Sequence, residues 1–441
     1  PPASAGLTFQ CGDTLGWSGN SGGSSGPHLH FEIRDTPSQH PLNPLQGWVT
    51  KSDSRPPSAP TWWIESELGL VSMPASGQDT VVVEDEVRVS IEAYDCLDGA
   101  SNICGIHTLH AVLKDGQGDV QWIHHFGLDE LNFSVNKDMN AHTLFPVWAQ
   151  ERDQVHRLHL LPGNRLDIYG GGAASGAVVL DSGEVATLEC TVWDVAGNQT
   201  TRTLVLRGGA SALPWTGVEF EGVSPQAMSP SSSHTLSAPQ ATLSWDSKTF
   251  FEPTAVGWRT DSTGLSAFVW PEFEAWRGKV DVAWRMPSPE VVWGISGAAL
   301  PQDAWPTADW VAVHEVGGQI KHAVPAEVQE GKWRMALPSG GAWRMVRDTV
   351  APKVIPYHSG TPLVQGGDAV WFVEDLLAGV ETLTLTIDGQ WARLVWDPKR
   401  NMATYEAADA RHPSGAPVRV QLEVMDAVGN AATWSGTLVW P

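Results

Sequence analysis

The chain has 441 residues and a formal net charge of −23 at pH 7, with 44 glycines, 31 prolines and 23 tryptophans. This length predicts two to four domains, and the composition, with few long helix-forming stretches, predicts a mainly β fold. The acidity argues against nucleic acid as a partner, because no basic patch is present to replace phosphate counterions, and it disfavours anionic membrane surfaces. No run of about 18 or more apolar residues occurs, so no membrane span is expected in this chain.

A glycine-rich segment at residues 19–26 leads into two histidines, His28 and His30. Because side chains alternate along a strand, both imidazoles are expected on one face and could share one pocket. Neutral imidazole is a good zinc ligand, and a catalytic zinc ion usually has three protein ligands and a water molecule. Glu32 has the same parity, so its carboxylate could orient an imidazole; a solvated strand end is the alternative. The segment therefore predicts half of a metal site.

Three pieces of sequence, residues 12–19, residues 24–32 and Asn43-Pro44, resemble the last third of a lysostaphin/LytM-type zinc metallopeptidase domain. The resemblance implies the end of a duplicated β hybrid motif, cleavage of peptide cross-links in bacterial peptidoglycan, and a periplasmic or extracellular location in the cell envelope. It also implies that His30 binds one zinc ion and that His28 is catalytic. Zinc would polarise the scissile carbonyl and acidify its bound water, and His28 would stabilise the oxyanion or transfer a proton.

The glycine-rich loop is expected to border the substrate groove of such an enzyme. Glycine allows close approach of a peptide backbone, which suits a cross-bridge made of small residues. A tryptophan beside the loop could border the same groove, although packing at the end of the domain is the commoner role for that residue. The groove candidates are Trp17, Gly19, Asn20, Gly22 and Gly26.

The other zinc ligands of that family come from an earlier His-x-x-x-Asp, and no histidine precedes His28 in this chain. The one downstream match, His125 to Asp129, is interpreted as a coincidence among 15 histidines. We therefore interpret the chain as a fragment that enters the family pattern midway. Alone, it is expected to be inactive and to bind well under one zinc ion per chain.

An internal repeat organises the rest of the chain. Each copy has a strand ending in aspartate, a Gly-Ile or Gly-Val pair, an Asp-Gly-Gln turn and an Asp-x-x-Gly-Asn motif. These landmarks are Asp95, residues 105–106, 115–117 and 194–198 in the first copy, and Asp375, residues 379–380, 388–390 and 426–430 in the second. Both copies are predicted to be Ig-like or fibronectin-like β-sandwiches. The first carries an insertion of roughly 50 residues, expected to form extra strands or a long loop.

The Asp-x-x-Gly-Asn motif is predicted to close a hairpin between the last two strands of each copy. Aspartate can cap such a turn, and glycine or asparagine accepts a positive φ. Calcium binding is the alternative role for these aspartates, but isolated acidic turns are more often structural.

The four cysteines exclude a disulfide-dense scaffold. Cys96 and Cys104 flank a short polar loop and could either pair or remain thiols. Cys11 and Cys190 are predicted to be buried apolar positions.

The predicted domains are residues 1–50, the end of the peptidase-like domain; 56–208, a sandwich with the insertion; 209–347, a middle β domain; and 348–441, a last Ig-like sandwich. A Pro/Ser-rich stretch at 224–233 precedes the Trp-rich strands of the middle domain. Most tryptophans alternate as strand residues do, which predicts a place in the core rather than stacking on carbohydrate.

Three functions remain open at this point. The first is a zinc metalloendopeptidase acting on peptidoglycan, favoured by the intact His-Leu-His segment. The second is a non-catalytic relative that binds peptidoglycan or activates another hydrolase, which requires loss of the upstream ligands. The third is an adhesive or structural surface protein in which the β-sandwiches, nearly the whole of this chain, carry the function.

Overall fold

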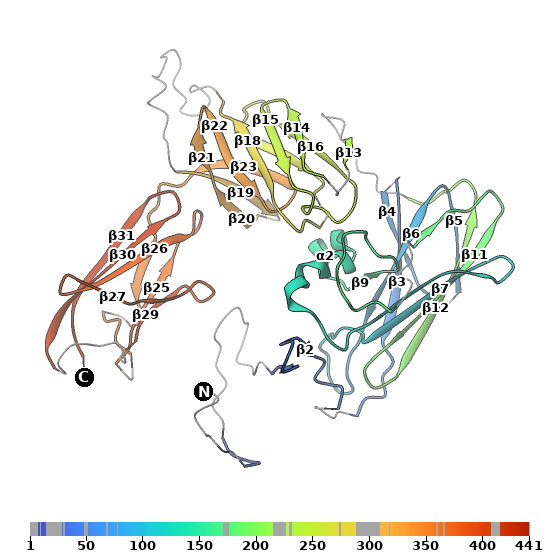
Figure 1. Cartoon of the computed structure of the whole chain (residues 1–441), viewed down its shortest axis with the longest axis horizontal. Coiled ribbons are helices and arrows are strands. Elements are labelled where there is room, and N and C mark those ends of the chain that lie inside the picture. The colour runs from blue at the N-terminus through green and yellow to red at the C-terminus, as the bar shows by residue number, and fades with distance from the viewer. Residues whose placement is uncertain are drawn as a thin grey trace. The chain divides into compact units, whose positions relative to one another are not determined.

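The computed structural model describes residues 8, 10–14, 29, 31–47, 52–67, 69–76, 78–170, 176–214, 226–228, 232–272, 275–287, 309–316, 318–358, 360–364, 367–406 and 415–440. It divides into two compact units, residues 32–347 and residues 348–441 with 1–31. The fold is mainly β and consists of Ig-like β-sandwiches, as the composition predicts (Figure 1).

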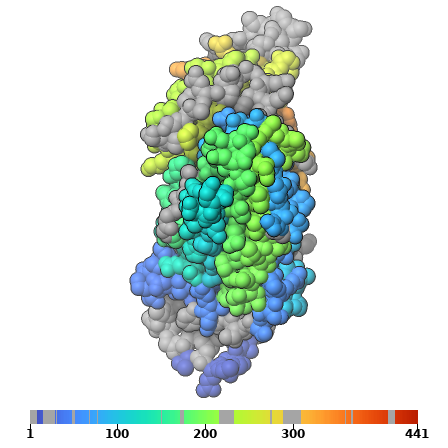
Figure 2. All heavy atoms as spheres, turned by 90° about the vertical axis from the view of Figure 1, so that its right-hand side faces the viewer, coloured from blue at the N-terminus to red at the C-terminus, as the bar shows by residue number. Residues whose placement is uncertain are grey.

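The first sandwich packs two antiparallel sheets around one core, with a single parallel pair between β5 and β12. One sheet, in the order β10-β6-β3-β4 with β9 beside β6, contains β3 (Ser58–Ser66), β4 (Gly69–Pro74), β6 (Val87–Tyr94), β9 (Val155–Arg157) and β10 (Ala177–Val178). The other, in the order β5-β12-β11-β7-β8, contains β5 (Gln78–Val83), β7 (Thr108–Asp115), β8 (Val120–Gly127), β11 (Val185–Trp193) and β12 (Gln199–Gly208). Figure 2 faces this second sheet, whose β11 and β12 are green.

The insertion of the first sandwich contains short helices as well as strands. Between β8 and β9 lie a 3-10 helix η2 (Phe133–Asp138), α1 (Met139–His142) and α2 (Phe145–Glu151). The expectation of strands or a long loop is therefore incomplete. Helical turns satisfy the backbone polar groups of this segment locally, as when Thr143 N–H donates to the Met139 carbonyl.

The middle sandwich is built around tryptophans. One sheet, β13-β16-β17-β23-β19-β20, contains β13 (Gln226–Met228), β16 (Thr254–Thr260), β17 (Ser266–Trp270), β19 (Trp310–Val316), β20 (Gln319–Pro325) and β23 (Gly341–Arg347). The other, β14-β15-β18-β22-β21, contains β14 (His234–Ala238), β15 (Ala241–Trp245), β18 (Val280–Arg285), β21 (Glu327–Gln329) and β22 (Lys332–Leu337). Trp258, Trp284 and Trp333 are fully buried, which confirms the core role predicted for them.

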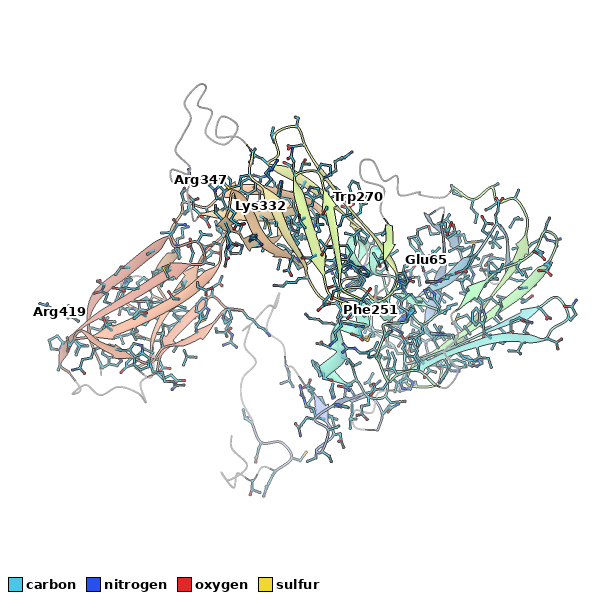
Figure 3. All side chains as sticks on the ribbon, turned by 45° about the horizontal axis from the view of Figure 1, so that its top comes forward. Glu65, Phe251, Trp270, Lys332, Arg347 and Arg419 are labelled. Carbon is cyan, nitrogen blue, oxygen red and sulfur yellow. The ribbon has the colours of Figure 1, made fainter. Side chains whose placement is uncertain are left out.

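The first and middle sandwiches contact each other through apolar and charged side chains, and we call this contact the junction. Phe251, labelled in Figure 3, packs in a small apolar cluster with Ala141 and Leu161 of the insertion. The buried Asp138 carboxylate pairs with Arg165 at 2.9 Å and with Arg277 of the middle sandwich at 3.3 Å. Apolar burial and paired charge thus hold these two sandwiches together.

The last sandwich repeats the plan of the first in a smaller form. One sheet, β24-β25-β29-β28, contains β24 (Lys353–Pro356), β25 (Ala369–Glu374), β28 (Val395–Asp397) and β29 (Met402–Tyr405). The other, β27-β26-β30-β31, contains β26 (Val380–Ile387), β27 (Gln390–Ala392), β30 (Pro417–Asp426) and β31 (Ala431–Val439). Exposed and buried residues alternate without exception along β30, as period-two strand geometry requires.

A short hairpin precedes the first sandwich and is attached to it. Strands β1 (Ile33–Arg34) and β2 (Pro41–Leu42) pair with each other. The backbone N–H of Asn43 donates to the Asp129 carbonyl at 2.8 Å, and that of Leu131 donates to the Pro41 carbonyl at 3.1 Å. The hairpin therefore belongs structurally with the loop that follows β8.

Candidate functional site

The predicted histidine site lies outside the described residues. This applies to His28 and His30 and to the groove candidates Trp17, Gly19, Asn20, Gly22 and Gly26. Glu32 is described and exposed, and its carboxylate accepts hydrogen bonds from Arg34 Nε at 2.8 Å and from the same guanidinium's second nitrogen at 3.1 Å. Its orienting role toward a histidine stays a prediction.

The downstream His-x-x-x-Asp places its two side chains in different surroundings. His125, on β8, packs edge-on against His110 with ring centroids 5.9 Å apart. The Asp129 carboxylate instead accepts from His107 Nε2 at 2.9 Å and from Gln46 Nε2. Within the described ranges, neither His125 nor Asp129 belongs to a group of three side chains that could share a metal ion.

Two groups of three aspartates do come together, one in each copy of the repeat. The first acidic cluster consists of Asp53, Asp95 and Asp194, and the second of Asp348, Asp375 and Asp426. In each cluster every residue offers one carboxylate oxygen, and the three oxygens lie within 4.8 Å of one another. The repeat identified in the sequence is therefore also a repeat of charged side chains in space.

The same three structural positions supply each cluster. One aspartate precedes the first strand of the sandwich: Asp53 before β3 and Asp348 before β24. A second follows the end of a strand in the sheet of β3 or β24: Asp95 after β6 and Asp375 after β25. The third begins the Asp-x-x-Gly-Asn turn, and these turns are residues 194–198 and 426–430.

In each turn the asparagine side chain donates hydrogen bonds to the aspartate that begins the turn and to the segment that enters the sandwich. In the first, the Asn198 N–H donates to Asp194 Oδ1 at 2.9 Å, and Asn198 Nδ2 donates to Asp194 Oδ2 at 2.7 Å and to the Asp53 carbonyl at 3.1 Å. In the second, Asn430 Nδ2 donates to Asp426 Oδ2 at 2.8 Å and to the Asp348 carbonyl at 2.9 Å. The prediction that the motif closes the last hairpin is confirmed, and the asparagine also fixes the segment that enters the sandwich.

Burial makes the first cluster electrostatically costly. Asp95 and Asp194 are each 4% exposed, and Asp53 is half-buried. Desolvation raises the pKa of Asp95, and the negative charges of Asp194 and Asp53 raise it further; a hydrogen bond from the Cys96 N–H and the charge of Arg55 act in the opposite direction. Ionised carboxylates therefore repel one another at this end of the sandwich.

The second cluster is better supplied with donors. Asp375 Oδ1 accepts from the N–H groups of Leu377 and Gly379, and the two oxygens of Asp348 accept from Val350 and Ala378. Burial still raises the pKa of Asp375, and Asp348 and Asp426 add to that shift.

The repeat in the sequence contains two aspartates of each cluster, but the sequence analysis misses Asp53 of the first cluster. Asp95, Asp194, Asp375 and Asp426 are landmarks of the repeat, and Asp348 is the first residue of the last predicted domain. Asp53 has no role in the sequence analysis, yet Asp53 and Asp348 each precede a proline by three or four residues and stand at the same position before the first strand. That shared Asp-to-Pro spacing is the signal that could have found it.

Most histidines of the first sandwich lie in its interior or line a pocket at its surface. His124, His142, His156 and His159 are buried. His110 and His125 line an open pocket of about 460 Å³ beside Trp193 and the Asp194 turn. Burial lowers the pKa of His110, and His125 lowers it further, which favours the neutral form of His110.

The cysteines give mixed outcomes. Cys190 is buried, as predicted, whereas the prediction for Cys11 is wrong because that residue is exposed. Cys104 forms an isolated backbone bridge with Asp95, the residue before Cys96, and among the described residues no disulfide joins the two cysteines.

No family model and no curated protein matches the chain. Solved structures with some likeness include the human desmocollin-1 ectodomain, at 11% identity over 87% of this chain and 58% of that chain, with a TM-score of 0.17. A Bacteroides ovatus mixed-linkage glucan utilization protein, SGBP-B, has 12% identity over 80% of this chain and 63% of its own, with a TM-score of 0.15. A structure from a 1.5-MDa bacterial ice-binding adhesin has 10% identity over 82% and 95%, with a TM-score of 0.13.

The chain thus spans about three fifths of the first two structures. With TM-scores this low, the whole chains do not superpose. Among the described helices, none is both long and apolar enough to cross a membrane.

Proposed function

We propose that the sandwiches of this chain form a structural or adhesive arm of an exported bacterial envelope protein. The observation that supports this most directly is the repeated asparagine contact, from Asn198 to the Asp53 carbonyl and from Asn430 to the Asp348 carbonyl. In both sandwiches the final hairpin binds the segment that enters the domain. Such a contact limits the angle at which the preceding part of the chain can leave, which is the property an arm requires.

The junction between the first and middle sandwiches supports the same proposal. Asp138, Arg165 and Arg277 form a partly buried ionic group, and Arg88 Nη1 donates to Glu252 Oε2 at 2.8 Å. Bound charges and the apolar Phe251 cluster act together there. Relative motion is the default expectation for neighbouring domains, and the apolar and ionic contacts of this junction oppose it, which supports a stiff arm.

The experiment compares bacterial cells that produce the natural protein with cells in which residues 58–441 are deleted from it. The arm proposal expects the protein to be accessible to antibodies outside the cytoplasm and the deletion to reduce attachment of cells to surfaces or to one another. Wall turnover, measured by release of soluble peptidoglycan fragments, should change less than attachment. Unchanged attachment together with a loss of wall turnover would contradict the proposal.

The second candidate is the zinc metalloendopeptidase acting on peptidoglycan peptides, favoured by the segment around His28 and His30. The β1–β2 hairpin that follows this segment is joined to the first sandwich through Asn43, whose Nδ2 donates to the Leu128 carbonyl at 3.2 Å. In such an enzyme the first sandwich would hold the hairpin that follows the histidines in sequence.

The residues described here do not make up a zinc site. The two groups of potential metal ligands found among them contain only aspartate, and zinc in proteins prefers nitrogen and sulfur ligands. We therefore derive no catalytic step through zinc.

The test of this candidate is to read the DNA upstream of the Pro1 codon for an in-frame His-x-x-x-Asp, and then to assay the protein that includes it. Release of soluble peptides from purified peptidoglycan, and about one zinc per molecule by elemental analysis, should both be lost in His30→Ala. An upstream frame without the ligand pair would favour the non-catalytic peptidoglycan-binding or hydrolase-activating alternative.

A further inference from the structure

Two buried carboxylate oxygens in the first acidic cluster have no hydrogen-bond donor. They are Asp95 Oδ1 and Asp53 Oδ2, each without a partner among the described residues. Asp95 is 4% exposed, so water reaches little of its side chain. Buried polar atoms in native proteins nearly always have a partner, and an exception calls for a missing ligand or a proton.

Nearby donors account for three of the other four oxygens of the cluster. Asp53 Oδ1 accepts from the Asp98 N–H at 2.9 Å, and both oxygens of Asp194 accept from Asn198. These contacts fix Asp53 and Asp194 in place, and one carboxylate oxygen from each of the three aspartates lies within 4.8 Å of the other two.

No side-chain cation fills that space. Within the described residues, none of the three aspartates forms an ion pair with lysine or arginine, and the exposed Arg55 acts on Asp95 only through its charge at a distance. Three carboxylates without a paired cation carry up to three negative charges in a mostly buried volume. An uncompensated buried charge is strongly destabilising, so a bound cation would stabilise this arrangement.

The ligand set selects the kind of cation. All the available ligands are carboxylate or backbone oxygens, which suit a hard cation and not zinc or copper. Calcium accepts six to eight oxygens in irregular geometry, whereas magnesium requires a near-ideal octahedron and keeps most of its water. Oxygens from an entering segment, a strand end and a hairpin turn form an irregular set, which favours calcium.

We propose that Asp53, Asp95 and Asp194 bind one calcium ion at the entry end of the first sandwich. The ion joins the entering segment, the end of β6 and the Asp194–Asn198 turn, with water and backbone carbonyls completing its coordination. This site does not depend on either proposed function. It reverses the preference stated from sequence, where the same aspartates were interpreted as turn residues.

The second acidic cluster is not included in this proposal. Its three positions are equivalent, but no buried oxygen of Asp348, Asp375 or Asp426 lacks a partner in the described structure. Backbone N–H groups there already stabilise the negative charge of the carboxylates, as a bound cation would.

The experiment is a calorimetric titration of CaCl₂ into the metal-stripped full chain, with Asp95→Asn, Asp53→Asn and Asp115→Asn as variants. Asp115 is a matched control, because it lies in the same sandwich but its exposed carboxylate accepts from the Gln117 and Asp119 N–H groups. Asp95→Asn and Asp53→Asn should each bind one calcium fewer than the natural chain, and Asp115→Asn should bind the same number. The half-buried Asp53 keeps the test valid if Asp95→Asn folds poorly.

Thermal unfolding gives a second readout that a hydrogen-bonding role for Asp95 would not produce. Calcium should raise the unfolding temperature of the natural chain and of Asp115→Asn by ligand linkage. In EDTA, Asp95→Asn should unfold at a higher temperature than the natural chain, because one repelling charge is gone, and calcium should then add no shift from this site. A proton shared by Asp53 and Asp95 is the competing explanation. Equal calcium stoichiometry in the natural chain and both cluster variants would overturn the calcium proposal and favour the shared proton.

Discussion

Asn198 Nδ2 donates a hydrogen bond to the Asp53 carbonyl at 3.1 Å, although 145 residues separate the two in sequence. The same amide nitrogen donates to Asp194 Oδ2 at 2.7 Å, so one side chain joins the start of the first sandwich to its last hairpin. Asn430 makes the equivalent pair of contacts in the last sandwich. The chain thus uses the same arrangement at the start of its first and of its last sandwich.

The first prediction concerns this contact. Asn198→Ala should lower the free energy of unfolding of the first sandwich by about 1–3 kcal/mol, because the part-buried Asp53 carbonyl and Asp194 carboxylate each lose a donor. Urea denaturation of the full chain measures this, with hydrogen exchange in β11 and β12 to assign the loss to the first sandwich. Gln199→Ala, at the exposed neighbouring position, is the control and should change little. Equal denaturation midpoints for the two variants would contradict the prediction.

The repeat shows how far sequence reasoning reaches. Alternation of apolar residues and the Asp-x-x-Gly-Asn motif predict the sandwiches and their last hairpins, because both depend on residues close in sequence. The gathering of Asp53 with Asp95 and Asp194 depends on which strands become neighbours across the sandwich, and that information is not local. The helices of the insertion were missed for a related reason: η2, α1 and α2 are short, and their burial against the β-sandwich core and the middle sandwich stabilises them more than their own propensity does.

The junction between the first and middle sandwiches supplies a second prediction. Burial opposes ionisation of Asp138, but hydrogen bonds from Arg165 and the charge of Arg277 outweigh it and lower the pKa of Asp138. Asp138→Asn leaves two guanidinium groups without their shared carboxylate and should cost about 3–5 kcal/mol.

Chemical denaturation should also show the two sandwiches unfolding less cooperatively in Asp138→Asn than in the natural chain. Because the folded pKa is depressed, the contribution of Asp138 is present above its unfolded pKa and is lost as pH falls through the folded value. Glu406→Gln removes the exposed ion pair with Arg393 and should cost under about 1 kcal/mol. A comparable cost for both variants would contradict the assignment of the junction.

The tryptophan core of the middle sandwich gives a third prediction. Trp333 is fully buried, with its ring centroid 5.6 Å from that of Trp284 and 4.9 Å from that of Trp310. Trp333→Ala should destabilise the middle sandwich by about 3–5 kcal/mol, since it creates a large cavity. Trp391→Ala removes an indole that is 72% exposed and should change stability by under about 0.5 kcal/mol. Thermal unfolding by calorimetry separates the two outcomes, and equal effects would refute the core assignment.

The last prediction follows from a chain of hydrogen bonds through buried histidines. One arrangement of protons satisfies every member: Asn164 Nδ2 donates to the Tyr169 hydroxyl, which donates to His142 Nδ1; His142 Nε2 then donates to His156 Nδ1, and His156 Nε2 donates to the Ala93 carbonyl. Both imidazoles are neutral in it. A further proton on either ring would face a donor where an acceptor is required.

Burial accordingly lowers the pKa of His156 to about 4, and burial with the neighbouring histidines lowers that of His142. The unfolded chain binds these protons near pH 6.5, so it holds more protons than the folded chain between about pH 6.5 and pH 4. The free energy of unfolding of the first sandwich should therefore decrease as the pH is lowered through this window, by about 1.4 kcal/mol per pH unit for each histidine that stays neutral in the folded chain.

Urea denaturation at pH 7.5, 6.5, 5.5 and 4.5, with hydrogen exchange in β6 and β11 as the local probe, measures this slope. His156→Gln should reduce the slope by about one proton, because glutamine does not titrate, whereas His358→Gln at an exposed position should leave it unchanged. A slope that is the same in all three proteins would mean that His156 is already protonated in the folded chain. The hydrogen-bond chain as described would then be wrong at its His142–His156 link, since that link needs one ring nitrogen to accept.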